Sequence, residues 1–295
     1  MMKTKGTSVL YAVLAAVLYA LNAPISKLLL SVSDVEPTMM AAFLYLGAGS
    51  GLLLYSGAEK ALGKGTSREP LTRAELPYTV AMVVFDIAAP ILLMLGISMS
   101  TSANASLLGN FEIVATSIIA LAIFRETISK KLWCAIILVT AASAVLSFEG
   151  IGALDFSTGS LFVLGACLCW GFENNCTRMI SHKSSVEIVI IKGLFSGAGS
   201  LIVALIIGEK FPHVKWIIAV LLLGFVAYGL SIHFYIMAQK ELGAAKTSAY
   251  YSIAPFIGVA FGMIILGEHG GIQFYVALAI MIVGTYFMVK DTLET

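Results

Sequence analysis

Acidic side chains inside long apolar stretches are the residues of this sequence best placed to do chemistry. Asp86, Glu112 and Glu173 lie in such stretches, and Lys192 is the one basic residue committed to the same depth. An ionised side chain in hydrocarbon costs several kcal/mol unless it faces a partner or a wet cavity. Once Lys192 pairs with one acid, another still needs a proton or the amino group of a bound solute. The pattern therefore predicts a buried site for a proton or for a cationic or zwitterionic compound.

Glu112 is the strongest candidate for the unpaired acid because it lies in a repeated stretch. Ala103 to Glu126 reads ANASLLGNFEIVATSIIALAIFRE, and Ala245 to Glu268 reads AKTSAYYSIAPFIGVAFGMIILGE. The residue numbers differ by 142 throughout, and each copy predicts one long apolar helix that closes on a glutamate. Glu112 lies midway along the first copy, where the second has Ala254. The alternative is a permanently protonated Glu112 that hydrogen-bonds a neighbouring helix, for example at Asn22.

Other polar and aromatic residues are predicted to line a path from the cytoplasm through the centre of the membrane. Flat rings offer apolar contact area and attract cations, which favours aromatic residues in such a path. The candidate substrate-binding or coupling residues are Asn22, Asp86, Glu112, Trp170, Glu173, Lys192, His233, Tyr250 and Tyr251.

Several of these candidates have a structural alternative. Glu173 and Lys192 could simply neutralise each other across two helices. His233 could carry a proton, because imidazole ordinarily titrates near neutral pH, or it could be a packing residue. Glu126 and Glu268, at helix ends, are expected to bind loop backbone or solvent rather than substrate.

The composition excludes a soluble domain. Hydrophobic residues make up 59% of the chain and charged residues 12%, whereas about 25% of residues are charged in a typical soluble domain. A net charge of +1, with the aromatic residues inside apolar runs, gives no reason to expect nucleic-acid binding. The four cysteines lack metal or disulfide spacing, so neither a metal site nor a cofactor is predicted.

The apolar runs predict an all-α integral membrane protein with ten transmembrane helices. Each span needs about 20 apolar residues. If the N-terminus is inside, 14 of the 18 basic residues lie in inside segments, which places both termini in the cytoplasm of a multi-pass protein of the cell (inner or plasma) membrane. The predicted spans are residues 7–30, 38–57, 77–98, 100–124, 131–148, 159–180, 186–208, 215–238, 243–266 and 272–289.

A second correspondence joins the first and sixth spans. Tyr19 to Leu28 aligns with Trp170 to Met179 at a difference of 151, with an aromatic residue, a small residue, and later a hydroxyl followed by a base. Residues 1–150 and 151–295 therefore each hold five predicted helices. Because five is odd, the second half enters the membrane from the opposite face, which gives inverted repeats with a site near the midplane.

These features resemble the ten-helix EamA-type transporters of the drug/metabolite transporter superfamily. The resemblance covers the whole chain and rests on the paired repeats, on Tyr19-Ala20 and Trp170-Gly171, on Pro255, and on the acidic helix ends. It implies transport of small metabolites, mostly outward. One departure is that the fourth span has Glu112-Ile113 where the ninth has Ala254-Pro255, so the two halves are not chemically equivalent.

The favoured function is a gradient-driven secondary transporter, an exporter of amino acids or amine-bearing compounds, and not an enzyme. No G-x-x-x-x-G-K-[ST] motif is present in the sequence to bind a nucleotide as fuel. The alternatives are a membrane-embedded enzyme, for which no metal or nucleophile motif is found, and a channel or sensor. The expected partners are a small-molecule substrate, protons and the lipid bilayer, and the chain is expected to be a monomer or homodimer. Gly193-x-x-x-Gly197 and Gly258-x-x-x-Gly262 predict close helix contacts, with a dimer seam at the second pair as the alternative.

Overall fold

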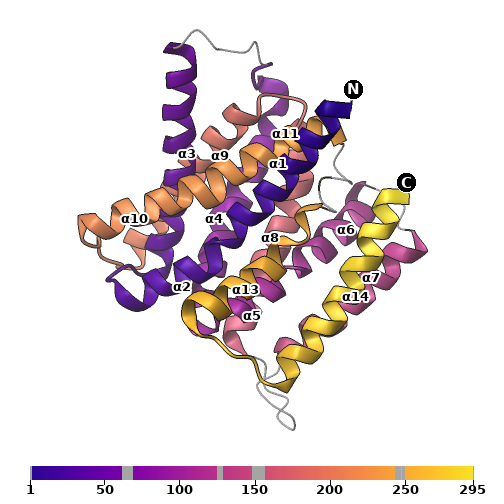
Figure 1. Ribbon diagram of the computed structural model, residues 1–295. Coiled ribbons are helices and arrows are strands. Elements are labelled where there is room, and N and C mark those ends of the chain that lie inside the picture. Colours follow the sequence, from indigo (N-terminus) through magenta and orange to yellow (C-terminus); the bar gives the residue numbers. More distant parts are fainter. Residues whose placement is uncertain are drawn as a thin grey trace.

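A computed structural model of the 295-residue chain describes residues 2–61, 69–124, 129–147, 157–242, 247 and 250–294, and these residues form helices without any strand (Figure 1). The elements are α1 (Met2–Ala20), α2 (Asn22–Val32), α3 (Pro37–Ala61), the 3-10 turn η1 (Arg73–Glu75), α4 (Leu76–Met99), α5 (Ser102–Leu108), α6 (Phe111–Phe124), α7 (Lys130–Ser147), α8 (Thr158–Ile180), α9 (Ser185–Ile206), α10 (Val214–Gly224), the π segment η2 (Phe225–Leu230), α11 (Ser231–Leu242), α13 (Ala254–Leu266) and α14 (Ile272–Glu294).

The membrane class predicted from composition is confirmed by the length and apolarity of these helices. Each of the ten predicted windows contains a helix, but the number of membrane crossings stays a prediction. Two shorter apolar helices cover residues 254–266 and 272–287. Within the described ranges, six helical segments are long and apolar enough to span a bilayer: Gly6–Val32, Pro37–Ala58, Arg73–Met99, Ser102–Ile123, Ser185–Ile206 and Val214–Ala238.

The repeated stretch is not one continuous helix, so that part of the expectation is wrong. The first copy breaks at Gly109 and Asn110, between α5 and α6. Both the backbone N–H and the side-chain amide of Asn110 donate to the carbonyl oxygen of Leu107, each at 3.2 Å. A side chain that competes for a helical carbonyl in this way interrupts the backbone ladder. Glu126, the last residue of the first copy, lies outside the described residues.

The second copy breaks at nearly the same place. A turn at Ser252 and Ile253 precedes α13, and Pro255 lies in the first turn of that helix. The first span is also divided, at Leu21 between α1 and α2, with Pro24 in the first turn of α2. Proline lacks an N–H and is best tolerated at the start of a helix, so both prolines stand where a new segment begins.

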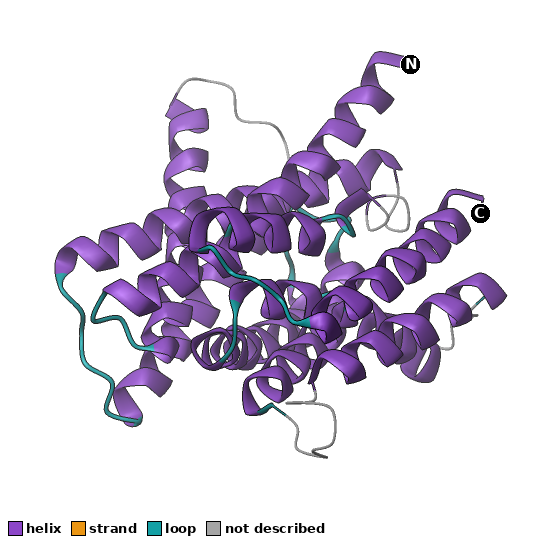
Figure 2. Ribbon diagram, turned by 60° about the horizontal axis from the view of Figure 1, so that its bottom comes forward, coloured by secondary structure: helices purple, strands orange, loops and turns teal. Residues whose placement is uncertain are grey.

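The helices pack in pairs that bring distant parts of the chain together. The most extensive pairs are α4 with α8, α3 with α9, α7 with α14, and α1 with α11, while α5 packs on α13 (Figure 1). The described part of the chain drawn in Figure 2 contains helices and loops and no strand. Both chain ends lie on the upper side of the bundle in Figure 1, and the α2–α3 and α13–α14 turns lie on the lower side.

Small residues allow α3 and α9 to approach closely, as predicted from the glycine spacing. A Cβ atom added to Gly193 would lie 2.3 Å from the backbone nitrogen of Gly49, and one added to Gly197 would lie 2.7 Å from that of Leu46. Neither position can accept a side chain without moving the helices. Such contact between backbones is how membrane helices gain packing energy without a hydrophobic driving force between them.

Carboxylates bind the starts of two helices across the bundle. Glu268 accepts hydrogen bonds from the backbone N–H groups of Ser102 and Ala103, both at 2.8 Å, and from the Ser102 hydroxyl. Glu209 binds the first N–H groups of α3 in the same way. Glu268 thus contacts backbone, as expected for a residue at a helix end. Gly262, which leaves 2.7 Å between an added Cβ and Ser102 Oγ, takes part in a contact within the chain.

Candidate functional site

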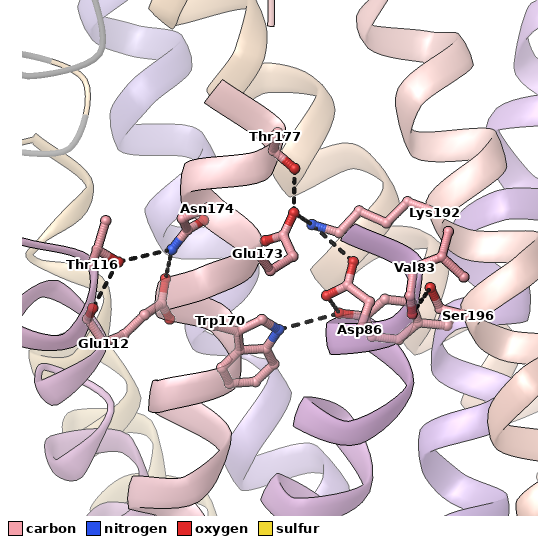
Figure 3. A network of polar contacts seen from close by, with 11 residues as sticks. Val83, Asp86, Glu112, Thr116, Trp170, Glu173, Asn174, Thr177, Lys192 and Ser196 are labelled. Atoms are coloured by element: carbon pink, nitrogen blue, oxygen red, sulfur yellow. Dashed lines mark hydrogen bonds and ion pairs between the residues drawn. The ribbon is translucent and has the colours of Figure 1, made fainter. Parts of the chain in front are cut away.

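The charged candidates meet in one cluster between three helices. Lys192 of α9 lies with its Nζ 2.8 Å from Glu173 Oε1 of α8 and 3.2 Å from Asp86 Oδ2 of α4 (Figure 3). All three side chains are buried, with Asp86 fully inaccessible. The predicted pair of Lys192 and Glu173 is therefore present, but it is part of a triad that the sequence did not indicate.

Further hydrogen bonds hold the two acids of this triad. The Thr177 hydroxyl, one turn along α8, donates to the same Glu173 oxygen that contacts Lys192. The Tyr45 hydroxyl of α3 donates to Asp86 Oδ1 at 2.9 Å. Trp170 Nε1 in turn lies 3.4 Å from the Tyr45 oxygen and donates to it. Sequence reasoning missed Tyr45, although a tyrosine inside an apolar helix needs a partner for its hydroxyl and is a signal in itself.

Glu112 lies on the other side of α8 from the triad. It is in the first turn of α6 and is partly buried, and its Oε1 accepts a hydrogen bond from Asn174 Nδ2 at 2.7 Å. The partially positive end of a helix favours a negative charge in its first turn. The break before α6 thus provides a favourable position for this acid. Its neighbour is Asn174 rather than the Asn22 considered from the sequence.

Asn22 instead takes part in a neutral pair. Its amide donates to the Tyr228 hydroxyl at 3.0 Å, and its oxygen accepts from Ser26 at 3.1 Å. Asn22 and Ser26 belong to α2, and Tyr228 belongs to the π segment of the eighth predicted span. These bonds join the first and eighth predicted spans without using a charge.

A cavity of about 70 Å³ lies between the broken helices. Four of the nine candidate residues line it: Asn22, Glu112, Trp170 and Tyr251. Asp86, Glu173 and Lys192 do not line it, and Trp170 links it to them through Tyr45. The remaining lining residues are Tyr19, Ala20, Ala23, Leu93, Ala105, Ser106, Gly109, Ile113, Val163, Cys167, Ser252, Ala254 and Pro255.

His233 and Tyr250 are not among the residues that surround this cavity. His233 is buried on α11, with its ring 6.1 Å from that of Tyr55 and 5.8 Å from that of Phe234. Tyr250 is partly buried. Its neighbour Tyr251 lines the cavity and contacts the rings of Tyr19 and Tyr235.

The arrangement can bind a small solute. The lining of the cavity is mostly apolar, with one carboxylate and one buried amide among the polar groups. Within the described ranges, no group of three or more His, Cys, Asp or Glu residues could hold a metal ion.

Comparison with known proteins identifies the family of the chain. The model of the EamA-like transporter family matches the chain twice, over residues 6–148 and 157–290. The chain belongs to the EamA-like transporter family. The buried acids and the cavity between broken helices are therefore features of a membrane transporter, as the sequence resemblance implied.

Individual relatives agree with this assignment. The chain is 26% identical to an "Uncharacterized transporter" of Methanothermobacter thermautotrophicus over 304 residues, covering 93% of this chain and 83% of the relative. It is 23% identical to "Uncharacterized transporter YyaM" of Bacillus subtilis, covering 66% of this chain and 67% of that one. A solved crystal structure shares the fold with a TM-score of 0.69 over 98% of both chains, at 15% identity.

Replacing Lys192 by methionine is expected to lower the free energy of unfolding by about 3–5 kcal/mol, because it removes the cation from two buried acids. Adding Asp86→Asn and Glu173→Gln to the methionine variant should recover much of the loss. Thermal unfolding of the purified variants in one detergent measures both effects. Exposed Lys215→Met is the control and should leave the melting temperature unchanged. Equal melting temperatures for wild type and Lys192→Met would contradict the assignment of Lys192 as counter-charge.

Proposed function

We propose that this family member is a secondary transporter that exports amino acids or other small amine-bearing metabolites by alternating access. The observation that carries the proposal is the small cavity between broken helices, with Glu112 as the acid in its wall. Carriers use a site that is enclosed and then exposed to each side in turn, whereas a channel needs a continuous path. The transport is driven by a gradient, since the sequence has no nucleotide-binding P-loop.

We propose further that the chain consists of two inverted five-helix repeats, residues 1–150 and 151–295. Two consecutive matches of one family model, over residues 6–148 and 157–290, support this duplication. The breaks at Gly109-Asn110 and Ser252-Ile253 fall within one residue of each other in the repeated stretch, and both border the cavity. Discontinuous helices that meet at the junction of inverted repeats are the usual place for a transporter site.

The chemistry of the two half-helix starts favours a zwitterion. The first turn of α6 carries Glu112, which can bind an ammonium group. The first turn of α13 carries uncharged Ala254 and Pro255 next to the cavity, and no side chain caps its start. That end is partially positive and suits a carboxylate. The rings of Trp170 and Tyr251 and the apolar lining would then contact the rest of an amino acid.

Tyr251 provides a first test, with Tyr250 as its matched control. Tyr251→Ala is expected to lower transport about tenfold, because loss of an aromatic contact in the cavity costs on the order of 1.4 kcal/mol of binding. Tyr250→Ala, outside the cavity lining, should have much less effect. The measurement is counterflow of a panel of radiolabelled amino acids and primary amines in proteoliposomes that contain equal amounts of each variant.

The same assay separates a carrier from the alternatives. A carrier shows saturable uptake that internal substrate accelerates, whereas a channel shows neither feature. If no compound of the panel is exchanged, or if the two tyrosine variants lose activity equally, the cavity is not the substrate site.

Glu112→Gln tests the role of the cavity acid. Glutamine has nearly the shape of a protonated glutamate and can still bond to Asn174, so the protein is expected to fold normally. Transport of an amine-bearing compound found in the panel should lose its dependence on pH, or its net flux, because no proton can be exchanged for the amino group. Glu75→Gln, which changes an acid of η1, is the control. An unchanged rate and pH profile in Glu112→Gln would remove Glu112 from the mechanism.

The proposed orientation, with both termini in the cytoplasm, rests on the distribution of basic residues along the sequence. A membrane-impermeant maleimide should label Thr72→Cys from the cytoplasmic side alone and Gly271→Cys from the outside alone. Both substitutions are made in a variant whose four native cysteines are replaced by alanine. Labelling of both positions from the same side would show that the number of crossings between them is even and would refute the ten-helix topology.

A further inference from the structure

The triad of Lys192, Asp86 and Glu173 holds one more acid than base. Lys192 is the one cation that the described residues place in contact with the two carboxyls. With both acids ionised the triad would carry a net charge of −1 in a part of the bundle from which water is almost excluded. Burying an uncompensated charge is far more costly than burying a matched pair. One proton on one of the two carboxyls removes this charge.

The contacts of the two carboxyls differ, and they indicate which one takes the proton. Glu173 Oε1 is bound by the Lys192 ammonium and by the Thr177 hydroxyl, so two donors stabilise its ionised form. Asp86 accepts one hydrogen bond, from Tyr45, at Oδ1. Asp86 Oδ2 lies 3.2 Å from Lys192 Nζ, farther than the 2.8 Å of Glu173 Oε1, and no second donor among the described residues binds it. The carboxyl oxygen with the longer contact to the ammonium and no other donor is the better place for a proton.

Among the described residues, the other titratable groups near the triad do not supply the missing positive charge. Each is a tyrosine, a cysteine or another acid, and their charged forms are negative. They are Tyr45 of α3, Cys169 and Cys176 of α8, Tyr228 of the π segment and Glu112 of α6.

Two hydrogen bonds connect Asp86 to the wall of the cavity. Trp170 donates to the Tyr45 oxygen, and Tyr45 donates to Asp86. Trp170 is one of the residues that line the cavity. When Asp86 loses a proton it becomes a stronger acceptor, which polarises the Tyr45 hydroxyl and makes its oxygen a better acceptor for Trp170. The 3.4 Å separation of Trp170 Nε1 and the Tyr45 oxygen leaves room for this bond to shorten.

We propose that the triad is a proton-binding site, that the proton resides on Asp86 Oδ2, and that Tyr45 transmits its presence to Trp170 in the cavity wall. The site is separate from Glu112, which faces Asn174 on the other side of α8. Its use in transport rests on the proposed function: a proton at Asp86 would then set the position of Trp170 and thereby the affinity of the cavity. The proton site itself requires no substrate and can be tested without one.

Infrared difference spectroscopy of the purified protein in lipid tests the position of the proton. Acid-to-base titration should reveal a carboxylic-acid C=O band that is lost on deprotonation. The band should be absent from Asp86→Asn and present in Glu112→Gln. Carbon-13 labelling of aspartate should shift it in the wild type, which assigns it to aspartate even if Asp86→Asn fails to fold. A band that responds only to glutamate labelling, or no buried carboxylic-acid band at all, would overturn the proposal.

Fluorescence of Trp170 tests the connection to the cavity. Trp133 and Trp216, the other two tryptophans, are replaced by phenylalanine so that Trp170 is the single reporter. Its emission should shift with pH together with the aspartate band. Tyr45→Phe should abolish the shift in emission and keep the band, whereas the control Tyr228→Phe, which removes a hydroxyl from another buried tyrosine, should keep both. If Trp170 emission does not change with pH, or if Tyr45→Phe still shows the shift, Tyr45 does not transmit the proton.

These measurements are independent of the transport assay. Failure of the substrate panel with an intact aspartate band would refute the proposed function and leave the proton site standing. Transport by the wild type without an aspartate band would refute the proton site and leave the carrier standing.

Discussion

The need to compensate charge inside the bilayer is the constraint on which this structure depends. Lys192 contacts acids from two other helices and so fixes α9 against α4 and α8. Lipid tails are as apolar as leucine side chains, so apolar burial does little to choose between arrangements of membrane helices. Polar contacts and close packing must make that choice. The glycines between α3 and α9 bring backbones together, and the triad determines which turn of each helix faces its neighbour.

Helix α8 connects the triad to the cavity through three residues on one of its faces. Glu173 and Asn174 follow Trp170 by three and four positions, so all three side chains lie on the same face of the helix, with Trp170 between the other two. Glu173 therefore reaches Lys192, Asn174 reaches Glu112, and Trp170 lies between them at the cavity (Figure 3). A displacement of α8 would change all three contacts together. This shared helix is a physical route by which the state of one acid could affect the other.

Hydropathy and charge count predicted much of this protein. The apolar windows located the helices, since each window is long enough to cross a bilayer and contains few charges. The excess of acids over Lys192 predicted a buried site, but spacing along the chain could not show that Lys192 contacts Asp86 as well as Glu173. Spacing also could not predict the helix break at Asn110. No proline is present there, and the break coincides with a side-chain amide that competes for the carbonyl of Leu107. Which residues meet across the bundle, such as Asn174 and Glu112, depends on how each helix is rotated about its own axis. The sequence of an apolar helix without a distinct polar face does not indicate that rotation.

The triad and the Asn22–Tyr228 hydrogen bond each join residues 1–150 to residues 151–295, but only the triad carries charge. Asn22 aligns with Glu173 at the difference of 151 that relates the first and sixth predicted spans. In the structure Asn22 and Tyr228 bind each other through a neutral hydrogen bond of 3.0 Å, whereas Glu173 and Asp86 share Lys192.

A neutral pair needs no cation and no proton, and its burial costs little once the hydrogen bond is made. Because one contact is made by an amide and a phenol and the other by two carboxyls and an ammonium, only the second can change its charge when a proton binds. The asymmetry also extends to the cavity wall, where Glu112 has Ala254 as its counterpart. In the proposed cycle the charge of the Asn22–Tyr228 contact therefore stays constant, while the triad gains and loses a proton.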